Sequence, residues 1–320
     1  MDSLTQAVLG AAIGEAILGQ RLGAKAAITG AILATIPDLD VILVPFYDEL
    51  QKISIHRGYS HSILFSLIMA SVAAFVLSKF KWAKAIPIPK LWLFSWLAFF
   101  THIILDAFTS YGTQLFLPFT DWRVSFDSIN IIDPVYTLPL LLGVLGSTVI
   151  FKKENKKRGI INKIGLIISS IYLIFTLGNK QNIEQIFQSQ LEEKNLPYFR
   201  LLTVPVKVGS INWYGVARDG ENLHIGKYSL WDDDEIIFHT FPINESLLKG
   251  LDEELVDRMK WFSQGFYTVA ESEGKIRIYN MQCDMQGIRE FGEYKAPTAF
   301  YFEIDPHNDG SFDLSSGMHP

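Results

Sequence analysis

The segment SILFSLIMASVAAFVLS, residues 62–78, contains no charged residue and is long enough to enter a lipid bilayer. A membrane-spanning helix needs roughly 20 mostly apolar residues, with about 17 as the lower end. Residues 135–151 and 164–179 are also free of charge, and residues 91–105 are apolar apart from His102. These segments all lie in the first part of the chain. They predict a membrane protein and argue against a soluble α-helical enzyme.

Two earlier segments, residues 4–19 and 24–46, are apolar as well but less uniform. They contain acidic residues, which are Glu15, Asp38 and Asp40. Each therefore either spans the membrane or enters it and returns on the same side. Together with the other segments they predict a membrane-embedded, all-α helical bundle of about six spans over residues 1–179.

The charge balance changes along the chain. Residues 1–179 carry 15 Lys and Arg against 11 Asp and Glu, whereas residues 180–320 carry 13 against 23. The second part therefore has a net charge of −10 and is predicted to be a soluble acidic domain. It has no basic stripe, so the sequence gives no support for nucleic-acid binding. Cys283 is the only cysteine, which excludes an internal disulfide and a multi-cysteine zinc site.

Alternating apolar residues predict that the second part is a small α+β domain of mostly β structure. Strands are expected at 199–208, 211–230, 236–241, 266–270, 275–281 and 298–303. Asp219-Gly220 indicates a hairpin turn inside the second of these segments. Residues 245–262 fit the apolar face of one helix. No catalytic group of residues is evident there, so the domain could cover the site, recruit a substrate or bind a partner protein that the sequence does not identify.

Lysine and arginine in short loops predict the orientation, because cytoplasmic loops are enriched in both. In a six-span arrangement three basic loops fall on one side. Their residues are Arg21, Lys25, Lys79, Lys81, Lys84, Lys90, Lys152, Lys153, Lys156, Lys157, Arg158 and Lys163. That side is expected to be cytoplasmic. Residues 180–320 are then expected on the outer, extracytoplasmic side of the cytoplasmic membrane.

Three pairs of ionisable residues adjoin the apolar segments. They are Asp38 with Asp40, His56 with His61, and His102 with Asp106. Such side chains are costly at membrane depth and are usually paired, bound to a metal or exposed to a wet cavity. Carboxylates and imidazoles are also the ligands of hydrolytic metal centres. The predicted topology brings all three pairs towards the outer side, where they could share one site.

Two of the pairs also have a simpler interpretation. His102 and Asp106, four residues apart on a helix, could bind one metal or only share a hydrogen bond that fixes helix packing. Asp38 and Asp40 follow Pro37, and both could reach one site if the chain is irregular there. Alternatively, one of them caps a helix and the other is solvated.

The stretch HRGYSHS, residues 56–62, is the most distinctive motif. Its two imidazoles could bind a metal or transfer protons. Arg57 could bind a phosphate or a carboxylate with both arms of its guanidinium group. The alternative is an interfacial loop that contacts lipid headgroups.

Several polar residues outside these pairs have structural interpretations. Ser3 and Gln6 fit a capping box at a helix start, and Asp133-Pro134 predicts another helix start. Glu15 is either a site carboxylate or a side chain that extends to the membrane interface.

Four motifs, in this order, resemble those of the YdjM-like family. They are Met1-Asp2-x-x-Thr5, Pro37-Asp38-x-Asp40, His56-Arg57-Gly58-x-Ser60-His61-Ser62 and His102-x-x-x-Asp106-x-x-Thr109-Ser110-Tyr111-Gly112-Thr113. The resemblance covers about residues 1–180. It implies a multi-span inner-membrane protein of a kind described as membrane-bound metal-dependent hydrolases, without an established substrate. Many members carry histidine at the position of Gln6, so the resemblance leaves the number of metal ions open.

Together these observations predict a membrane-embedded metal-dependent hydrolase that acts at the outer membrane–water interface. A divalent metal, zinc by ligand type, would be held by Asp38, His56, His61, His102 and Asp106. Asp40 would be a further ligand or a general base, and Arg57 would stabilise an anionic transition state. The location favours a lipid or lipid-linked phosphoester as the substrate. The alternative is a non-catalytic membrane transporter or adaptor, in which the His/Asp cluster is a proton relay or a packing network.

Overall fold

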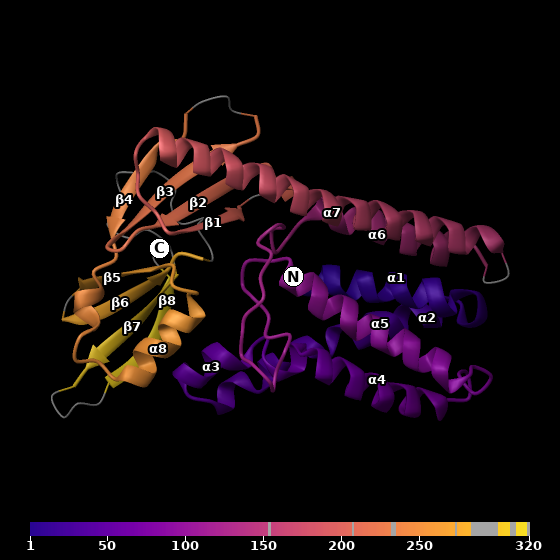
Figure 1. The fold of residues 1–320 in the computed structure, drawn as a ribbon. Coiled ribbons are helices and arrows are strands. Elements are labelled where there is room, and N and C mark those ends of the chain that lie inside the picture. Colours follow the sequence, from indigo (N-terminus) through magenta and orange to yellow (C-terminus); the bar gives the residue numbers. More distant parts are fainter. Residues whose placement is uncertain are drawn as a thin grey trace. The chain divides into compact units, whose positions relative to one another are not determined.

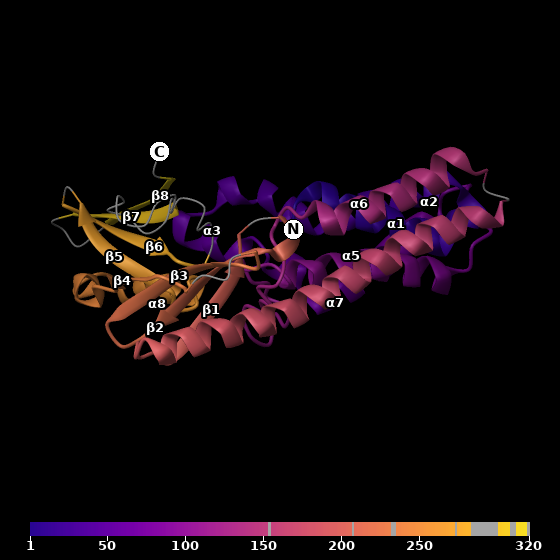
Figure 2. The same cartoon turned by 90° about the horizontal axis from the view of Figure 1, so that it is seen from above.

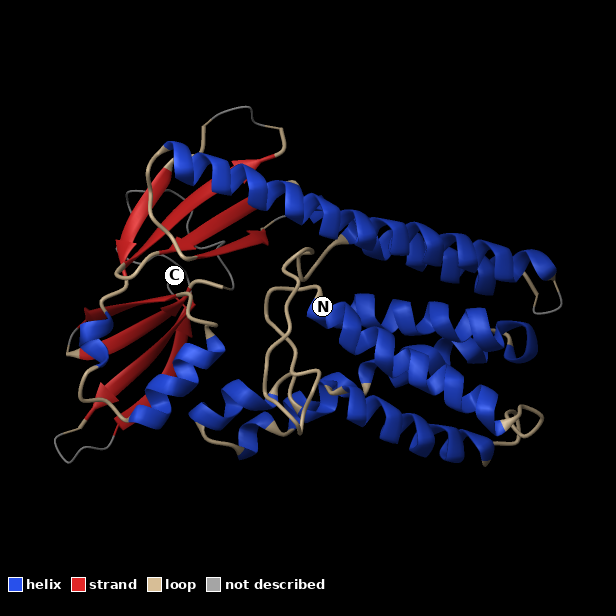
Figure 3. Ribbon diagram, in the orientation of Figure 1, coloured by secondary structure: helices blue, strands red, loops and turns tan. Residues whose placement is uncertain are grey.

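The computed structural model describes residues 1–152, 155–206, 208–231, 235–272, 274–282, 300–307 and 312–318. These residues form two compact units. The helical unit comprises residues 1–46 and 55–177, and the strand unit comprises residues 47–54 and 178–320. Figure 3 shows the difference in secondary structure between them.

The helical unit consists of α-helices joined by short irregular turns (Figure 1). Its elements are α1 (Ser3–Leu22), α2 (Ala24–Thr35), η1 (Pro37–Ile42), η2 (Val44–Phe46), η3 (Tyr59–His61), α4 (Ile63–Ser78), α5 (Ile88–Ala107), α6 (Pro134–Leu145), the π-helical turn η4 (Gly146–Ile150) and the first part of α7 (Lys156–Glu193). A short helix, α3 (Glu49–Ile55), lies almost entirely in the strand unit. The predicted start of α6 is confirmed, because Asp133 caps the helix and Pro134 is its first residue.

Two helices among the described residues are long and apolar enough to cross a membrane by themselves, α5 and α7. Two bent pairs could each form one more span. They are Ala24–Thr35 with Pro37–Phe46, bent by 45°, and Leu50–His61 with Ile63–Ser78, bent by 55°. The described chain thus has two to four candidate spans, and the predicted number of about six is not confirmed.

The other two predicted spans fall short for different reasons. The helix α1 has 20 residues, but Gln6, Glu15 and Gln20 lie within it and lower its apolar character. The helix α6 and the π-helical turn after it form a shorter apolar helix, Pro134–Ile150.

The helices α1 and α2 form a tight antiparallel pair because glycines face each other across it. A Cβ on Gly30 would lie 2.0 Å from the carbonyl oxygen of Gly10, and one on Gly14 would lie 2.1 Å from that of Ala26. No side chain fits in these places, so the two backbones approach closely, as small residues allow in membrane helix pairs. Apolar side chains of α4 and α5 pack against this pair, among them the buried Phe94.

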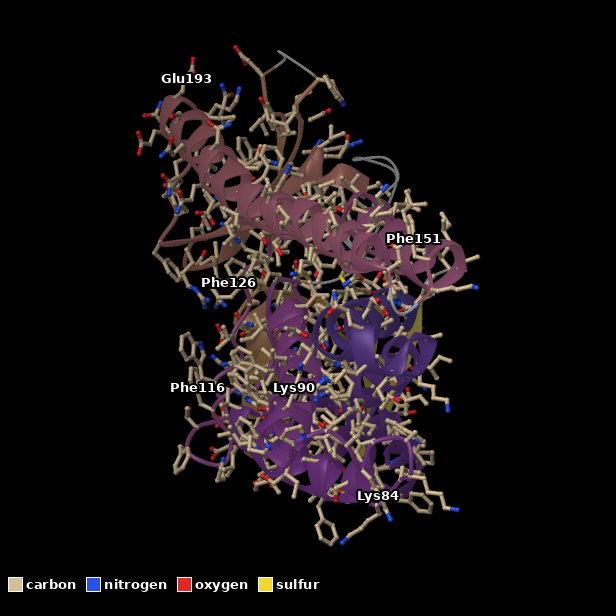
Figure 4. All side chains as sticks on the ribbon, turned by 90° about the vertical axis from the view of Figure 1, so that its right-hand side faces the viewer. Lys84, Lys90, Phe116, Phe126, Phe151 and Glu193 are labelled. Carbon is tan, nitrogen blue, oxygen red and sulfur yellow. The ribbon has the colours of Figure 1, made fainter. Side chains whose placement is uncertain are left out.

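The basic loops lie at one end of the helical unit, which we call the basic end. There α1, α4 and α6 finish and α2, α5 and α7 begin (Figure 1). Figure 4 is viewed from this end and labels Lys84 and Lys90. Lys153 lies outside the described residues. The three predicted basic loops therefore do share one end of the unit.

The described residues of the strand unit form two antiparallel sheets of four strands each. The first is formed by β1 (Arg200–Pro205), β2 (Asn212–Arg218), β3 (Asn222–Ser229) and β4 (Phe238–Pro242), and the second by β5 (Tyr267–Ser272), β6 (Lys275–Asn280), β7 (Phe300–Pro306) and β8 (Phe312–Met318). The predicted hairpin is confirmed, because β2 and β3 pair around Asp219 and its carboxylate accepts the backbone N–H of Glu221 at 2.7 Å.

Two predictions for the strand unit need correction. The single helix predicted over residues 245–262 is two elements, η6 (Glu245–Leu248) and α8 (Glu253–Phe262). Asp252 divides them, since its side chain accepts from the backbone N–H of Leu255 and caps α8. The strand β8 was not predicted, and residues 298–299 of the last predicted strand lie outside the described residues.

The helix α7 continues without a break from the helical unit into the strand unit (Figure 2). Its second part packs on the first sheet, where Ile183 and Phe187 form a buried cluster with Trp213. A Cβ on Gly215 would lie 2.3 Å from the ring of Phe187, so the glycine makes room for this aromatic side chain. The first sheet thus has its core against α7.

Candidate metal centre

The Asp38/Asp40 pair lies on η1, directly after the bend that ends α2. Pro37 is the first residue of this 3-10 helix, as expected of a residue that cannot continue the preceding hydrogen-bond pattern. The side chain of Asp40 is buried and that of Asp38 is 20% exposed. The chain is therefore irregular at this point, as predicted, and both carboxylates reach the same group of residues.

The motif of residues 56–62 wraps around Asp40. One carboxylate oxygen of Asp40 accepts the backbone N–H of Arg57 at 3.1 Å and the Ser60 hydroxyl at 2.8 Å. Its other oxygen lies 3.1 Å from Nδ1 of His56. Arg57 has a φ of 59°, a left-handed conformation that is unfavourable for a residue with a side chain. These bonds to Asp40 hold the turn that leads to His61.

His102 and Asp106 lie one turn apart on α5, and both are buried. The Nε2 atom of His102 is 3.4 Å from Oδ2 of Asp106. The same nitrogen is 3.2 Å from Nε2 of His61, which comes from the turn η3 before α4. The helix α5 and the 3-10 segments η1 and η3 therefore contribute to one point at the end of the helical unit opposite the basic end.

Four ligand atoms converge there, and we call these residues the His/Asp cluster. One ligand atom from each of Asp38, His61, His102 and Asp106 can be chosen so that all lie within 4.8 Å of one another. His61 Nε2 is 3.3 Å from Asp38 Oδ1 and 3.2 Å from Asp106 Oδ2. Such a set of two carboxylates and two imidazoles matches the ligand types of a zinc site.

A cation would satisfy atoms that lack a partner in this cluster. Oδ2 of Asp106 is buried and has no hydrogen-bond partner in the described chain. The Nε2 atoms of His61 and His102 lie 3.2 Å apart, so the two imidazoles either share a hydrogen bond or, with both protons on Nδ1, present two lone pairs to a cation. The donor set therefore fits a divalent metal ion.

His61 is oriented from its far side. Its Nδ1 lies 2.9 Å from the Ser60 hydroxyl and 3.4 Å from Oδ2 of Asp40. A carboxylate at this distance favours a proton on Nδ1 and leaves the lone pair of Nε2 directed into the cluster, an arrangement typical of metal-binding histidines. Asp40 thus contacts two imidazoles but is not one of the four converging residues.

The remaining predicted site residues, His56 and Arg57, lie beside the four converging residues. His56 is 31% exposed and its ring lies edge-on to that of His61, with centroids 6.0 Å apart. Arg57 is buried, with Nη2 3.2 Å from Oδ1 of Asp106 and Nη1 2.8 Å from the hydroxyl of Thr109. Four of the five predicted metal ligands are therefore brought together, and His56 stands beside them.

Two further groups contact the carboxylate of Asp106. The Nε2 atom of Gln6 donates to Oδ1 of Asp106 at 3.1 Å, and the amino group of Met1 contacts the same oxygen. From its neighbours Gln6 was interpreted as part of a capping box, but Asp2 caps α1 by accepting the backbone N–H of Thr5. The family resemblance, in which many members carry histidine at this position, was the signal that indicated a place at the site.

Glu15 has neither of its two predicted roles. It is buried and forms a two-armed ion pair with Arg158 of α7, with distances of 2.5 and 2.6 Å. Nearby, Asn162 of α7 donates to the backbone carbonyl of Ala12 at 2.8 Å. These contacts tie α1 to α7 and have no connection with the His/Asp cluster.

Comparison with known proteins agrees with the motifs. The profile of the YdjM inner membrane protein family matches residues 1–183, which is more than half of the chain. The chain is 34% identical over 141 residues to the uncharacterized protein YfhP of Bacillus subtilis (strain 168), covering 42% of each chain. It is 29% identical over 104 residues to the inner membrane protein YbcI of Escherichia coli (strain K12), covering 32% of this chain and 56% of YbcI.

These matches span about half the length of the two relatives. No solved structure matches the chain. Because the family profile covers most of the chain, including all residues of the His/Asp cluster, the chain belongs to the YdjM inner membrane protein family.

Proposed function

We propose that this member of the YdjM family is a metal-dependent hydrolase embedded in the cytoplasmic membrane, acting at the outer membrane–water interface. The observation that carries the proposal is the convergence of Asp38, His61, His102 and Asp106, with an unpartnered carboxylate oxygen facing two imidazole nitrogens. A packing network would be expected to satisfy its own buried polar atoms. This cluster instead has a surplus of lone pairs directed at one point.

The four converging residues would hold the ion, which we propose is zinc because two imidazoles and two carboxylates suit it. When bound, such an ion supplies a nucleophilic water with a pKa of about 7. Asp40 would keep His61 in the tautomer that presents Nε2 to the ion, through the contact of its carboxylate with Nδ1.

His56 is better suited to proton transfer than to metal binding. Its Nδ1 lies 3.1 Å from Asp40 Oδ1, and Nε2 has no hydrogen-bond partner in the part of the chain that the structure describes. A partly exposed imidazole oriented by a carboxylate can donate a proton to a leaving group. We therefore assign His56 this role and Asp40 the role of orienting it.

Arg57 would act through charge. Its guanidinium group contacts the inner oxygen of Asp106 and the Thr109 hydroxyl, so it is fixed beside the cluster rather than free to follow a substrate. A fixed positive charge close to the reacting atoms would favour the ionised form of Asp106 and stabilise negative charge that develops during hydrolysis.

Exposed apolar side chains near the cluster support a lipid or lipid-linked phosphoester as substrate. The segment that carries Asp38 and Asp40 exposes Leu39, Val41, Ile42, Leu43 and Phe46. The loop after α5 exposes Phe119, at 86%, and Trp122, at 61%. Exposed apolar patches mark interaction surfaces, and aromatic residues gather at membrane interfaces. Lipids could approach the cluster along these surfaces.

The charge distribution supports an outward-facing site. The basic loops and the cluster lie at opposite ends of the helical unit, and basic loops favour the cytoplasm (Figure 1). With the basic end inside, the cluster faces outward. The chain after α7 would then also be outside the cell.

Metal analysis and lipid hydrolysis together test this proposal. The detergent-purified full chain is expected to contain stoichiometric metal and to release phosphate-containing products from phospholipid vesicles. Asp38→Ala is expected to lose both the metal and the activity while still inserting into membranes. A wild-type protein that binds no divalent metal would refute the proposal.

One contact favours a second candidate, a proton-conducting transporter. The two imidazoles lie 3.2 Å apart through their Nε2 atoms, a geometry that could share a proton. In that case the protein, reconstituted in vesicles, would move protons in the presence of a metal chelator. A hydrolase would lose its activity under the same conditions.

A further inference from the structure

The two carboxylate oxygens of Asp106 have different surroundings. Oδ2 faces His61 Nε2 at 3.2 Å and His102 Nε2 at 3.4 Å, and it has no hydrogen-bond partner in the described chain. Oδ1 accepts from Gln6 Nε2 at 3.1 Å and lies 3.2 Å from Nη2 of Arg57. One oxygen is therefore available to a metal ion, and the other is occupied by N–H donors.

Gln6 is fixed in this position by a second bond. Its Nε2 also donates to the backbone carbonyl of His102 at 3.2 Å, so both of its N–H groups are directed at α5. The side chain is fully buried, and its Oε1 has no hydrogen-bond partner in the part of the chain that the structure describes. A buried amide that leaves its acceptor unsatisfied is unfavourable for packing alone. Its two donor bonds, however, fix the orientation of Asp106.

A second metal ion would need other free ligand atoms, and Asp40 does not supply them. One of its oxygens accepts from Arg57 N and the Ser60 hydroxyl, and the other contacts Nδ1 of His56. Among the described residues, only the four members of the His/Asp cluster converge as a possible metal site.

We propose that Gln6 is a positioning residue that holds Asp106 as a one-oxygen ligand and thereby limits the centre to one metal ion. This inference rests on the proposed metal-dependent function. A carboxylate that bound one ion through both oxygens, or bridged two ions, would require Oδ1. That oxygen is held by Gln6 together with Arg57 and the amino group of Met1, so it becomes available only when these donors leave it.

The test measures metal binding rather than activity, using the full chain in detergent. Wild type is expected to hold one zinc ion per chain by elemental analysis. Gln6→Leu removes one of the donors that orient Asp106, so zinc affinity in a chelator competition is expected to fall roughly 10- to 100-fold. The zinc X-ray absorption spectrum should change as well, because the orientation of the Asp106 carboxylate is then less restricted.

Asn162→Leu is a matched control. Asn162 is also fully buried and its amide also donates to a backbone carbonyl, that of Ala12, but it has no contact with the cluster. Its replacement is expected to leave zinc affinity and the absorption spectrum unchanged. Should Gln6→Leu fail to fold, Gln6→Met keeps the side-chain length and carries the same expectation.

The outcomes separate the two proposals. A wild-type chain without zinc contradicts the metal-dependent function itself. One zinc ion in wild type, with the Gln6 variant and Asn162→Leu equally affected, overturns the positioning role while leaving the metal site intact. Two zinc ions in wild type overturn the limit to one ion.

Discussion

Two of the buried ionic groups in the helical unit differ in how fully their atoms are satisfied. At the basic end, both carboxylate oxygens of Glu15 meet the guanidinium group of Arg158, so one negative charge meets one positive charge. In the His/Asp cluster, acceptors outnumber donors, and Asp106 keeps an oxygen without a hydrogen bond. The first arrangement is complete as it stands, whereas the second leaves room for a cation. Burial of charge alone therefore does not indicate a candidate metal site, but convergent ligand atoms with an unpartnered oxygen do.

The largest expected effect is the loss of metal from the His/Asp cluster. His102→Ala removes one of four converging ligands, so metal affinity should fall by more than the roughly 100-fold that a lost outer partner can cost. Elemental analysis after size-exclusion chromatography measures this. Glu15→Gln serves as the control and should retain its metal. Equal metal content in His102→Ala and Glu15→Gln would mean that the His/Asp cluster and the Glu15–Arg158 pair do not differ in metal binding.

Changes to the Glu15–Arg158 ion pair should lower the stability of the fold and not the metal content. Glu15→Leu leaves Arg158 buried without its partner, which is expected to lower the free energy of unfolding by roughly 3–5 kcal/mol. Thermal unfolding in detergent measures the loss. Replacing both residues by apolar ones should recover most of the stability, because no unpaired charge remains. If the double variant is no more stable than Glu15→Leu, the ion pair contributes more to the fold than the neutralisation of its own two charges.

A smaller effect is expected from the residue that orients His61. Asp40→Asn keeps the size of the side chain but removes its charge, so the preference for a proton on Nδ1 of His61 weakens. Metal affinity should fall roughly 10- to 100-fold, with the fold retained. A chelator competition provides the value. An unchanged affinity would exclude an orienting role for Asp40.

The smallest effect concerns a half-buried ion pair of the strand unit, between Arg277 and Glu303. The hydrogen bond from Arg277, followed by that from Lys275, lowers the pKa of Glu303 below its ordinary value of 4.5. A lowered carboxyl pKa contributes stability that is present above pH 4.5 and is lost as the pH falls through the folded-state pKa. Glu303→Gln should therefore cost less than about 1 kcal/mol near neutral pH. The thermal unfolding midpoints of wild type and Glu303→Gln should differ more at pH 7 than at pH 3. An equal difference at the two pH values would contradict this direction of the pH dependence.

The sequence was most informative where residues close together in the chain share a role. His102 and Asp106 needed only helical spacing, and the irregular segment after Pro37 followed from the proline. The hairpin at Asp219 and the cap at Asp133 were local signals of the same kind.

The convergence of the His/Asp cluster was predicted from the topology and the motifs, but two other contacts between distant residues were not. Arg158 lies 143 positions from Glu15, and nothing in either neighbourhood indicates the other. Gln6 meets Asp106 across 100 positions, while its local surroundings indicate a helix cap. The helix break before Asp252 was missed for a different reason. Apolar residues at helical spacing occur on both sides of Asp252, so the pattern predicted one helix, although Asp252 is a typical N-cap residue that begins a new one.

The ligands of the His/Asp cluster also lie far apart in the chain, and this has a consequence for the abundance of the protein. Asp38, His61 and Asp106 stand on three separate segments, so an ion bound by all of them binds the folded chain and not the unfolded one. An ion at 100 times its dissociation constant would add about 2.7 kcal/mol to the stability of the fold. Metal supply would then regulate how much of the protein escapes degradation, before any question of catalysis arises.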